Sequence, residues 1–328
     1  MISAKISALG TYVPPCVLTN RDLEKMVDTS DAWLVERTGI RQRHIVDRGI
    51  ASSDLAVEAA KKLLATRQIE ATSLDAIFVA TVTPDMMFPA TACLVQDRLG
   101  ARGAWGFDLS AGCCSFLYAV QTAVKFVESG AHKRVLVIGV DVMSSIVNYD
   151  DRTTCTLFGD GSGAVLIEPA EGPEGFIDFL HEVDGSGRCS LYMPAGGSRH
   201  PASCATVQNK MHTVHLSGQS VFKHAVRKLV ELSECLLRRN GYSAQDVALF
   251  VPNQSNSRIV TAAAQRLGLE PERYVLNIGE YGNTAGASVP LALHTAQQQG
   301  RLKKGDLILM AAVGAGFTGG AALLRWAF

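Results

Sequence analysis

Short apolar runs alternate with longer stretches of helical periodicity along this chain, which is the pattern of an α/β protein. Residues 75–81 and 134–139 are apolar runs of the kind that forms buried parallel strands. Between them, a third strand-like run leads through small residues at 110–114 into a helical pattern over 116–130 that ends in Gly. The order strand, corner, helix, strand predicts a βαβ unit.

The same unit occurs a second time at an offset of 172 residues, so that Phe250 lies over Phe78. Its two strands, its corner and its helix are expected at 247–253, 306–311, 282–286 and 289–300. Residues 116–126 are apolar on nearly every face, which predicts a helix buried between two sheets. The repeat therefore indicates a fold built from two similar, layered parts.

A chain of 328 residues exceeds a typical single core, which agrees with this duplication. We expect two pseudo-duplicated, βαβ-rich halves, an N-terminal half over 1–170 and a C-terminal half over 171–328. No Pro/Gly/Ser-rich linker divides them, and 168–173 is the seam that the sequence offers.

Composition and charge exclude several classes of protein. The formal net charge is zero and 47% of the residues are hydrophobic, which is typical of a globular domain and does not indicate nucleic-acid binding. The eight cysteines show no metal-ligand spacing, so we expect no metal and a reducing compartment. The apolar runs are shorter than the roughly 18 residues of a membrane helix, and no export signal begins the sequence. We therefore expect a cytoplasmic protein without membrane insertion.

Cys113 is the leading candidate for a nucleophile because it stands at the corner between a strand and an apolar helix. Helix N-termini carry partial positive charge, which lowers the pKa of a nearby thiol and favours the reactive thiolate. The alternative is a small buried hydrophobe, which most free cysteines are. Cys114 fits that alternative, because it faces about 100° away around the helix.

Two asparagines are expected beside Cys113. In open α/β sheets ligands gather at the carboxyl ends of strands, and the pseudo-twofold repeat brings three such ends together. One carries Cys113, one carries Asn253, and the corner at 282–286 carries Asn283.

These features resemble the 3-oxoacyl-acyl-carrier-protein synthase III family of the thiolase superfamily, and the resemblance extends from end to end. It implies a thiolase-like fold in a layered αβαβα arrangement. The matching segments lie at 29–33, 37–41, 88–89, 110–114, 158–164, 221–226, 251–258, 282–284 and 314–318.

The resemblance implies a condensing enzyme without a cofactor. The cysteine takes an acyl group from acyl-CoA, and the carbanion formed by decarboxylation of malonyl-acyl-carrier protein then attacks that thioester. Cys113 matches the nucleophile, the N–H groups of Cys113 and Gly316 match the oxyanion hole, and Asn283 matches the asparagine that holds the malonyl thioester carbonyl.

Asn253 departs from the family pattern, because the family has histidine at this position. An amide donates a hydrogen bond, but unlike imidazole it does not take up a proton and become positively charged near neutral pH. We therefore expect condensation to be impaired more than acyl loading. Asn253 is either a natural divergence or a near-isosteric replacement that arrests the enzyme. In a second departure, Gly319 replaces a common tryptophan, which either enlarges a pocket or changes a surface loop.

The resemblance also implies contacts for the substrates and for a second subunit. The residues that match coenzyme A contacts are Trp33, Arg37, Arg152, Phe222, Ala225 and Asn256. Phe88 and Met143 match the acyl pocket. Lys223 and Arg258 match the docking site for the carrier protein. Phe88 matches a residue that reaches across a dimer interface into the partner's pocket, so a homodimer is implied.

Two alternatives to the condensing enzyme stay open. One is an acyltransferase of the same family that passes acyl groups on without decarboxylating malonate, which the missing histidine would suit. The other is a non-catalytic partner that stabilises a sister synthase. Acyl chain length and branching are left open.

Overall fold

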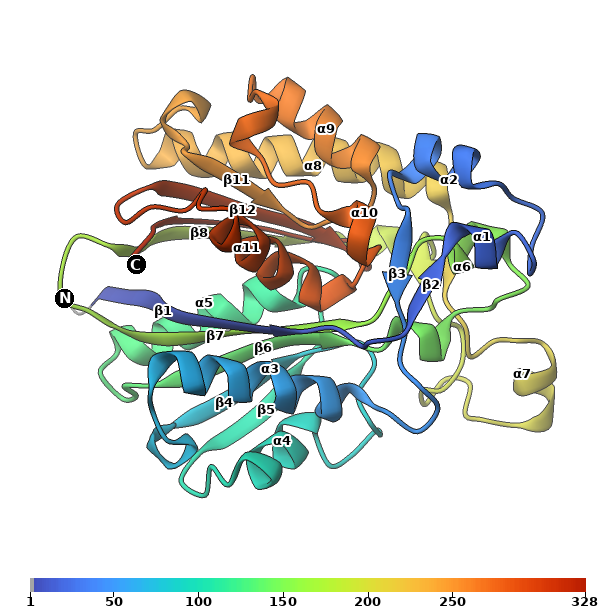
Figure 1. Ribbon diagram of the computed structural model, residues 1–328, viewed down its shortest axis with the longest axis horizontal. Coiled ribbons are helices and arrows are strands. Elements are labelled where there is room, and N and C mark those ends of the chain that lie inside the picture. Colours follow the sequence, from blue (N-terminus) through green and yellow to red (C-terminus); the bar gives the residue numbers. More distant parts are fainter. Residues whose placement is uncertain (1–2) are drawn as a thin grey trace.

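Two β-sheets alternate with three layers of helices in the computed structural model, which describes residues 3–328 (Figure 1). The first sheet has the strand order β1-β7-β6-β4-β5 and the second the order β11-β12-β13-β8. The strands of the first sheet are β1 (Ser3–Tyr12), β4 (Ala76–Ala80), β5 (Trp105–Leu109), β6 (Val135–Asp141) and β7 (Gly161–Ala170). Those of the second are β8 (Gly175–Val183), β11 (Leu249–Pro252), β12 (Leu307–Gly314) and β13 (Thr318–Arg325).

The middle layer consists of α5 (Ser115–Glu128) and α11 (Ser288–Gln298), which contact both sheets. On the outer faces lie α3 (Ser52–Arg67) and α4 (Thr91–Leu99) against the first sheet, and α8 (Gly218–Arg239) and α9 (Ser257–Arg266) on the side of the second (Figure 1). The expected αβαβα order is confirmed. The core explains it, because the buried residues of α5 join those of both sheets in one cluster that removes much apolar surface from water.

The internal duplication is confirmed in the strand pairing. In the first sheet β4 pairs in parallel with β6, with Phe78 opposite Val137. In the second sheet β11 pairs in parallel with β12, with Phe250 opposite Leu309. The counterpart of β5 is reduced to a single parallel bridge between Phe250 and Tyr274. The seam expected at 168–173 falls at the connection between β7 and β8.

Smaller elements gather beyond the carboxyl ends of the central parallel strands, on the right of Figure 1. They are β2 (Val17–Thr19), α1 (Asn20–Leu23), α2 (Asp31–Thr38), β3 (Gln42–His44), α6 (Arg152–Cys155), β9 (Leu191–Tyr192), α7 (Cys204–Gln208), β10 (His215–Leu216) and α10 (Ile278–Tyr281). Together they build walls around the strand ends. Over the described residues, no helix has both the length and the apolarity needed to cross a membrane.

Candidate active site

Cys113 lies at the corner between β5 and α5, one residue before the helix N-cap Cys114, and only 7% of its surface is exposed. The hydroxyl of Ser115 fixes this corner, because it accepts from the Ala111 N–H at 2.9 Å and donates to the Gly112 carbonyl. Gly112 has φ +56°, a conformation that favours glycine. Cys114 is fully buried and donates to the Ala312 carbonyl at 3.3 Å, which agrees with a packing role.

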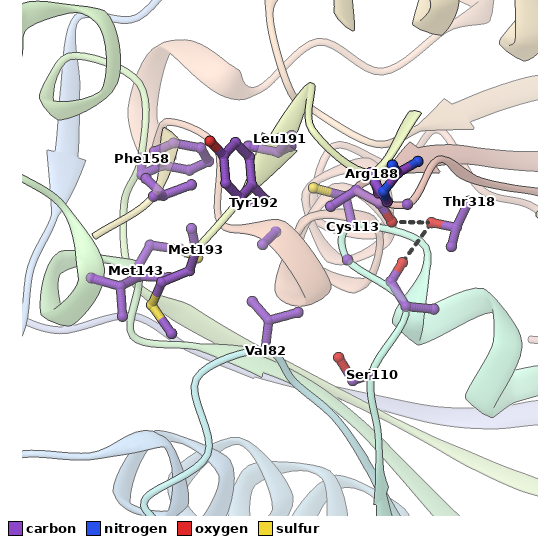
Figure 2. Close-up of a pocket in the computed structure, with 17 residues that line it drawn as sticks. Val82, Ser110, Cys113, Met143, Phe158, Arg188, Leu191, Tyr192, Met193 and Thr318 are labelled. Atoms are coloured by element: carbon purple, nitrogen blue, oxygen red, sulfur yellow. Dashed lines mark hydrogen bonds between the residues drawn. The ribbon is translucent and has the colours of Figure 1, made fainter. Parts of the chain in front are cut away.

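A loop from the second half meets this corner. A Cβ on Gly112 would lie 2.6 Å from the Ala315 nitrogen, and a Cβ on Gly314 would lie 2.6 Å from the Cys113 nitrogen, so both positions need glycine. The Thr318 hydroxyl ties the loop down through contacts with the Ala111 carbonyl at 2.7 Å and the Ala315 carbonyl at 3.2 Å, the two dashed lines in Figure 2. Gly316, on the same loop, lines one cavity with Cys113.

The side chains of Asn283 and Asn253 lie beside Cys113, where both favour the ionised form of its thiol. The Asn283 side-chain oxygen accepts from the Ala285 N–H at 3.0 Å, and its backbone is held by the Leu157 carbonyl. Asn253 is 2% exposed, and its backbone N–H donates to the Ala311 carbonyl. Its side-chain oxygen is buried without a hydrogen-bond partner among residues 3–328. The structure thus brings together the three strand ends that the sequence predicted.

The expectation of a low thiol pKa is wrong. Burial, followed by the nearby Asp141 carboxylate, raises the pKa of Cys113 to about 12, although hydrogen bonds from Asn283 and Asn253 act in the opposite direction. The free-energy cost of removing the thiolate from water is larger here than the stabilisation that the two asparagines provide.

This raised pKa predicts how Cys113 reacts with iodoacetamide. Because only the thiolate reacts, alkylation should rise about tenfold per pH unit from about pH 7 to pH 10 without a plateau. Peptide-resolved mass spectrometry measures the rate at Cys113 separately from the exposed thiols of Cys16, Cys93, Cys189 and Cys204. A plateau below about pH 8 would contradict a high pKa.

Asp141 is a fully buried carboxylate behind the site. Burial raises its pKa to about 6, despite hydrogen bonds from the Val82 and Gly286 N–H groups and the hydroxyls of Thr81 and Thr83. The bond from the Gly286 N–H, at 2.8 Å, joins the end of β6 to the turn that follows Asn283. Asp141 therefore helps to hold the two halves together at the site.

A cavity of about 390 Å³ opens beside Cys113 (Figure 2). Most of its walls are apolar, and Met143 lies in them as expected. The other apolar or aromatic side chains include Val82, Ile146, Phe158, Leu191, Tyr192, Met193 and Val214. Phe88 does not line this cavity and is 84% exposed, and the neighbouring Met86 and Met87 also face outward.

A narrower cavity of about 110 Å³ reaches Cys113 and Asn283 from another direction. Phe222, Ala225 and Asn256, which the family resemblance matches to coenzyme A contacts, are among the residues that line it. This cavity therefore runs from the surface between α8 and α9 to the thiol.

The remaining predicted contact residues lie on the surface around this channel. Asn256 donates from its side chain to the Arg37 carbonyl at 3.2 Å, and Arg258 stacks over Phe222 at 5.7 Å. Lys223 is exposed. The Arg152 guanidinium stacks over the Trp33 ring at 5.1 Å.

No histidine lines either of the two cavities that reach Cys113. His224 stacks on Phe317 with ring centroids 3.9 Å apart, and His294 is hydrogen-bonded to Thr11. Nowhere within 3–328 do three or more His, Cys, Asp or Glu side chains form a group that could hold a metal ion.

Gly319 does not enlarge either cavity. It lies within β13, where a Cβ would meet Leu232 at 2.8 Å and Glu182 at 3.2 Å. The space is filled by α8 and β8, and Gly319 is buried, so neither explanation expected for the missing tryptophan applies.

Sequence reasoning missed Asp141 and Arg188, and it gave Thr318 no role beyond its place in the matching segment 314–318. A single acid at the end of an apolar strand is a signal that could have identified Asp141. Arg188 carries no comparable signal, because its place depends on a loop from the second half of the chain.

Comparison with known proteins identifies the family. The family model "3-Oxoacyl-[acyl-carrier-protein (ACP)] synthase III" matches residues 107–185, and its C-terminal counterpart matches residues 237–326. The beta-ketoacyl-[acyl-carrier-protein] synthase III of Koribacter versatilis is 59% identical over 99% of this chain and 98% of its own length. That of Solibacter usitatus is 59% identical over the full length of both.

Solved structures agree with the sequence comparison. The 3-oxoacyl-[acyl-carrier-protein] synthase III from Aquifex aeolicus is 42% identical with a TM-score of 0.91, covering 98% of this chain and all of its own. The enzyme of that name from Pseudomonas aeruginosa is 39% identical with a TM-score of 0.92, covering 99% of each chain. The fold is thus thiolase-like, and the relatives are acyltransferases. The chain belongs to the 3-oxoacyl-acyl-carrier-protein synthase III family, whose enzymes act in fatty-acid biosynthesis.

Proposed function

We propose that this protein transfers an acyl group from acyl-CoA to Cys113 and condenses it slowly with malonyl-acyl-carrier protein, releasing CO₂. The observation that carries this proposal is a nearly buried thiol, with the side chains of Asn253 and Asn283 beside it, where two cavities meet. In the loading step, the Cys113 sulfur forms a bond to the acyl carbon. The bond to the coenzyme A sulfur breaks, and the thiol proton leaves with coenzyme A.

The backbone N–H groups of Cys113 and Gly316 stabilise the oxyanion in this step. Their loops approach so closely that glycine is required at Gly112 and Gly314, which supports a rigid pair of donors. In the condensation step, Asn283 and Asn253 donate to the malonyl thioester oxygen as the enolate forms. Asn253 supplies a hydrogen bond but cannot act as an acid or a base near neutral pH, so we expect this step to be slow.

Coenzyme A enters through the channel lined by Phe222, Ala225 and Asn256, with its adenine between Trp33 and Arg152 and its phosphates near Arg37. The stacking of Arg152 on Trp33 supports this role, because a flat base can insert between a guanidinium and an indole. We expect neither the loading step nor the condensation step to require a cofactor.

A second candidate is an acyltransferase that loads Cys113 and passes the acyl group to another thiol without decarboxylation. The absence of histidine among the residues that line the two cavities favours it. A non-catalytic scaffold is disfavoured, because a stabilising partner needs neither a channel to a thiol nor two amide donors beside it.

We infer that the protein acts as a homodimer. β5 is an edge strand of the first sheet, and Trp105 on it is 44% exposed. The nearby loop presents Met86, Met87 and Phe88, of which Phe88 is the most exposed. A second copy placed along this edge would cover these side chains and bring Phe88 to the partner's acyl cavity.

The proposal is tested by giving the protein acetyl-CoA and malonyl-acyl-carrier protein and measuring acyl-enzyme and 3-oxoacyl product together. Complete loading with slow product formation is the expected result. Product formation as fast as loading would contradict the role given to Asn253, and no loading would refute the proposal.

The carrier protein is proposed to dock at Lys223 and Arg258. Reversing both charges should therefore weaken the reaction with the carrier-protein substrate. The Lys223→Glu/Arg258→Glu protein should lose about tenfold or more in kcat/KM for the carrier-protein substrate at low salt, and much less for acyl-CoA loading. Lys303→Glu, an exposed charge before β12 at the far end of the second sheet, is the matched control. Equal loss with both substrates, or a rate insensitive to salt in the unmodified protein, would remove the docking site from the account.

A further inference from the structure

Arg188 is the only charged residue among the 17 that line the cavity beside Cys113. Figure 2 shows it on the same side of the cavity as Cys113 and Thr318, apart from Met143 and Met193 on the other side. Within residues 3–328, the Arg188 guanidinium forms neither an ion pair nor a hydrogen bond with the chain. Arg188 is itself exposed to solvent, so a cation without a protein partner stands at the rim of a cavity that is otherwise apolar.

The loop that carries Arg188 is firmly held. The backbone N–H and carbonyl of Asp184 both hydrogen-bond to Phe317, and the Asp184 carboxylate accepts from the Ser186 N–H at 3.0 Å. A Cβ on Gly187 would lie 2.1 Å from the Phe317 ring, so the loop packs directly on the segment that contains Gly316. After Arg188, the Ser190 carbonyl accepts from Ser217, and β9 pairs with β10. Arg188 is thus presented from a fixed backbone, which reduces the entropy lost when it binds an anion.

We propose that Arg188 binds the carboxylate of a short dicarboxylic acyl group, such as malonyl or succinyl, that is carried on Cys113. A planar guanidinium pairs with a carboxylate through two parallel hydrogen bonds, a geometry that a hydrocarbon group cannot offer. A purely hydrocarbon acyl chain would leave the exposed guanidinium to water alone. This inference deepens the proposed function, since it rests on acyl transfer to Cys113 and names the substrate class.

The transfer itself balances without a further reactant. The Cys113 sulfur attacks the thioester carbonyl of malonyl-CoA, the bond between that carbon and the coenzyme A sulfur breaks, and the thiol proton leaves with coenzyme A. The carboxylate remains intact and pairs with Arg188. Ion pairing also retains the malonyl group, because loss of CO₂ moves the negative charge from the carboxylate to the α-carbon, away from the guanidinium. Asn253 also favours retention of the malonyl group, because it provides no imidazole to assist the loss of CO₂.

The test compares malonyl-CoA with isovaleryl-CoA, in which an uncharged isopropyl group replaces the carboxylate at nearly the same size. Loading rates are measured by intact-protein mass, which also distinguishes a malonyl-enzyme from an acetyl-enzyme that has lost CO₂. Arg188→Met should lower the malonyl-to-isovaleryl ratio of kcat/KM about 3- to 10-fold, because it removes a bidentate ion pair that solvent partly screens. Arg199→Met, an exposed arginine that does not line the cavity, should leave the ratio unchanged.

Three outcomes would overturn the inference. If isovaleryl-CoA loads and malonyl-CoA does not, the carboxylate is not accepted, although acyl transfer to Cys113 stands. If Arg188→Met leaves the ratio unchanged but raises KM for malonyl-acyl-carrier protein in condensation, Arg188 binds the second substrate instead. If neither thioester loads, the proposed function itself fails, and this inference fails with it.

Discussion

Replacing Asn253 with His should raise the rate of condensation about 100-fold while changing acyl loading much less. The negative charge of the developing enolate lies on the malonyl thioester oxygen, next to Asn253 and Asn283. A well-placed donor in a site that excludes water is typically worth about 10²- to 10³-fold in rate, and an imidazole adds acid-base capacity that an amide lacks. CO₂ release and 3-oxoacyl product are measured in both proteins, with acyl-enzyme formation followed in parallel.

Asn253→Ala is the matched control, because it removes the amide without adding an imidazole. It should not raise condensation, and its loading should fall only modestly because Asn283 still lies beside the thiol and favours the thiolate. If Asn253→His leaves condensation unchanged while loading stays intact, the arrested-synthase interpretation fails. A dedicated acyltransferase then becomes the better account.

Replacing Cys113 with Ser should lower acyl loading by about 10³-fold or more, because a hydroxyl without an adjacent base is a much weaker nucleophile. Cys114→Ser is the control within the same corner. Its hydroxyl can keep the hydrogen bond that the Cys114 thiol donates to the Ala312 carbonyl, so loading should stay close to that of the unmodified protein. Thermal unfolding of both variants separates loss of the nucleophile from loss of the fold. Full loading of the Cys113→Ser protein would contradict the assignment.

The layered fold was predictable because its central elements are also its most apolar ones. The helix expected over 116–130 is α5 (Ser115–Glu128), and the one expected over 289–300 is α11 (Ser288–Gln298). Both helices are buried between sheets and are apolar on most faces. Their apolar pattern and the glycines after their ends are local signals that locate them in the sequence. The convergence of Cys113, Asn253 and Asn283 followed from the repeat, because corresponding strands end at the same edge.

The electrostatics of the site were not predictable in the same way. The thiol pKa depends on burial by both halves of the chain and on Asp141, which lies at the end of β6 and is connected to the Asn283 turn through Gly286. Arg188 reaches the cavity because Asp184 and Phe317, far apart in the sequence, hydrogen-bond to each other. Such long-range contacts leave no local pattern in the sequence.

The most direct test of the account is the site of acylation. The unmodified protein is incubated with acetyl-CoA, its intact mass is measured, and the labelled peptide is then sequenced by mass spectrometry. We expect one acetyl group per chain, carried by Cys113. An acetyl group on Cys114 or on any other residue, or no acetyl group at all, would contradict the account.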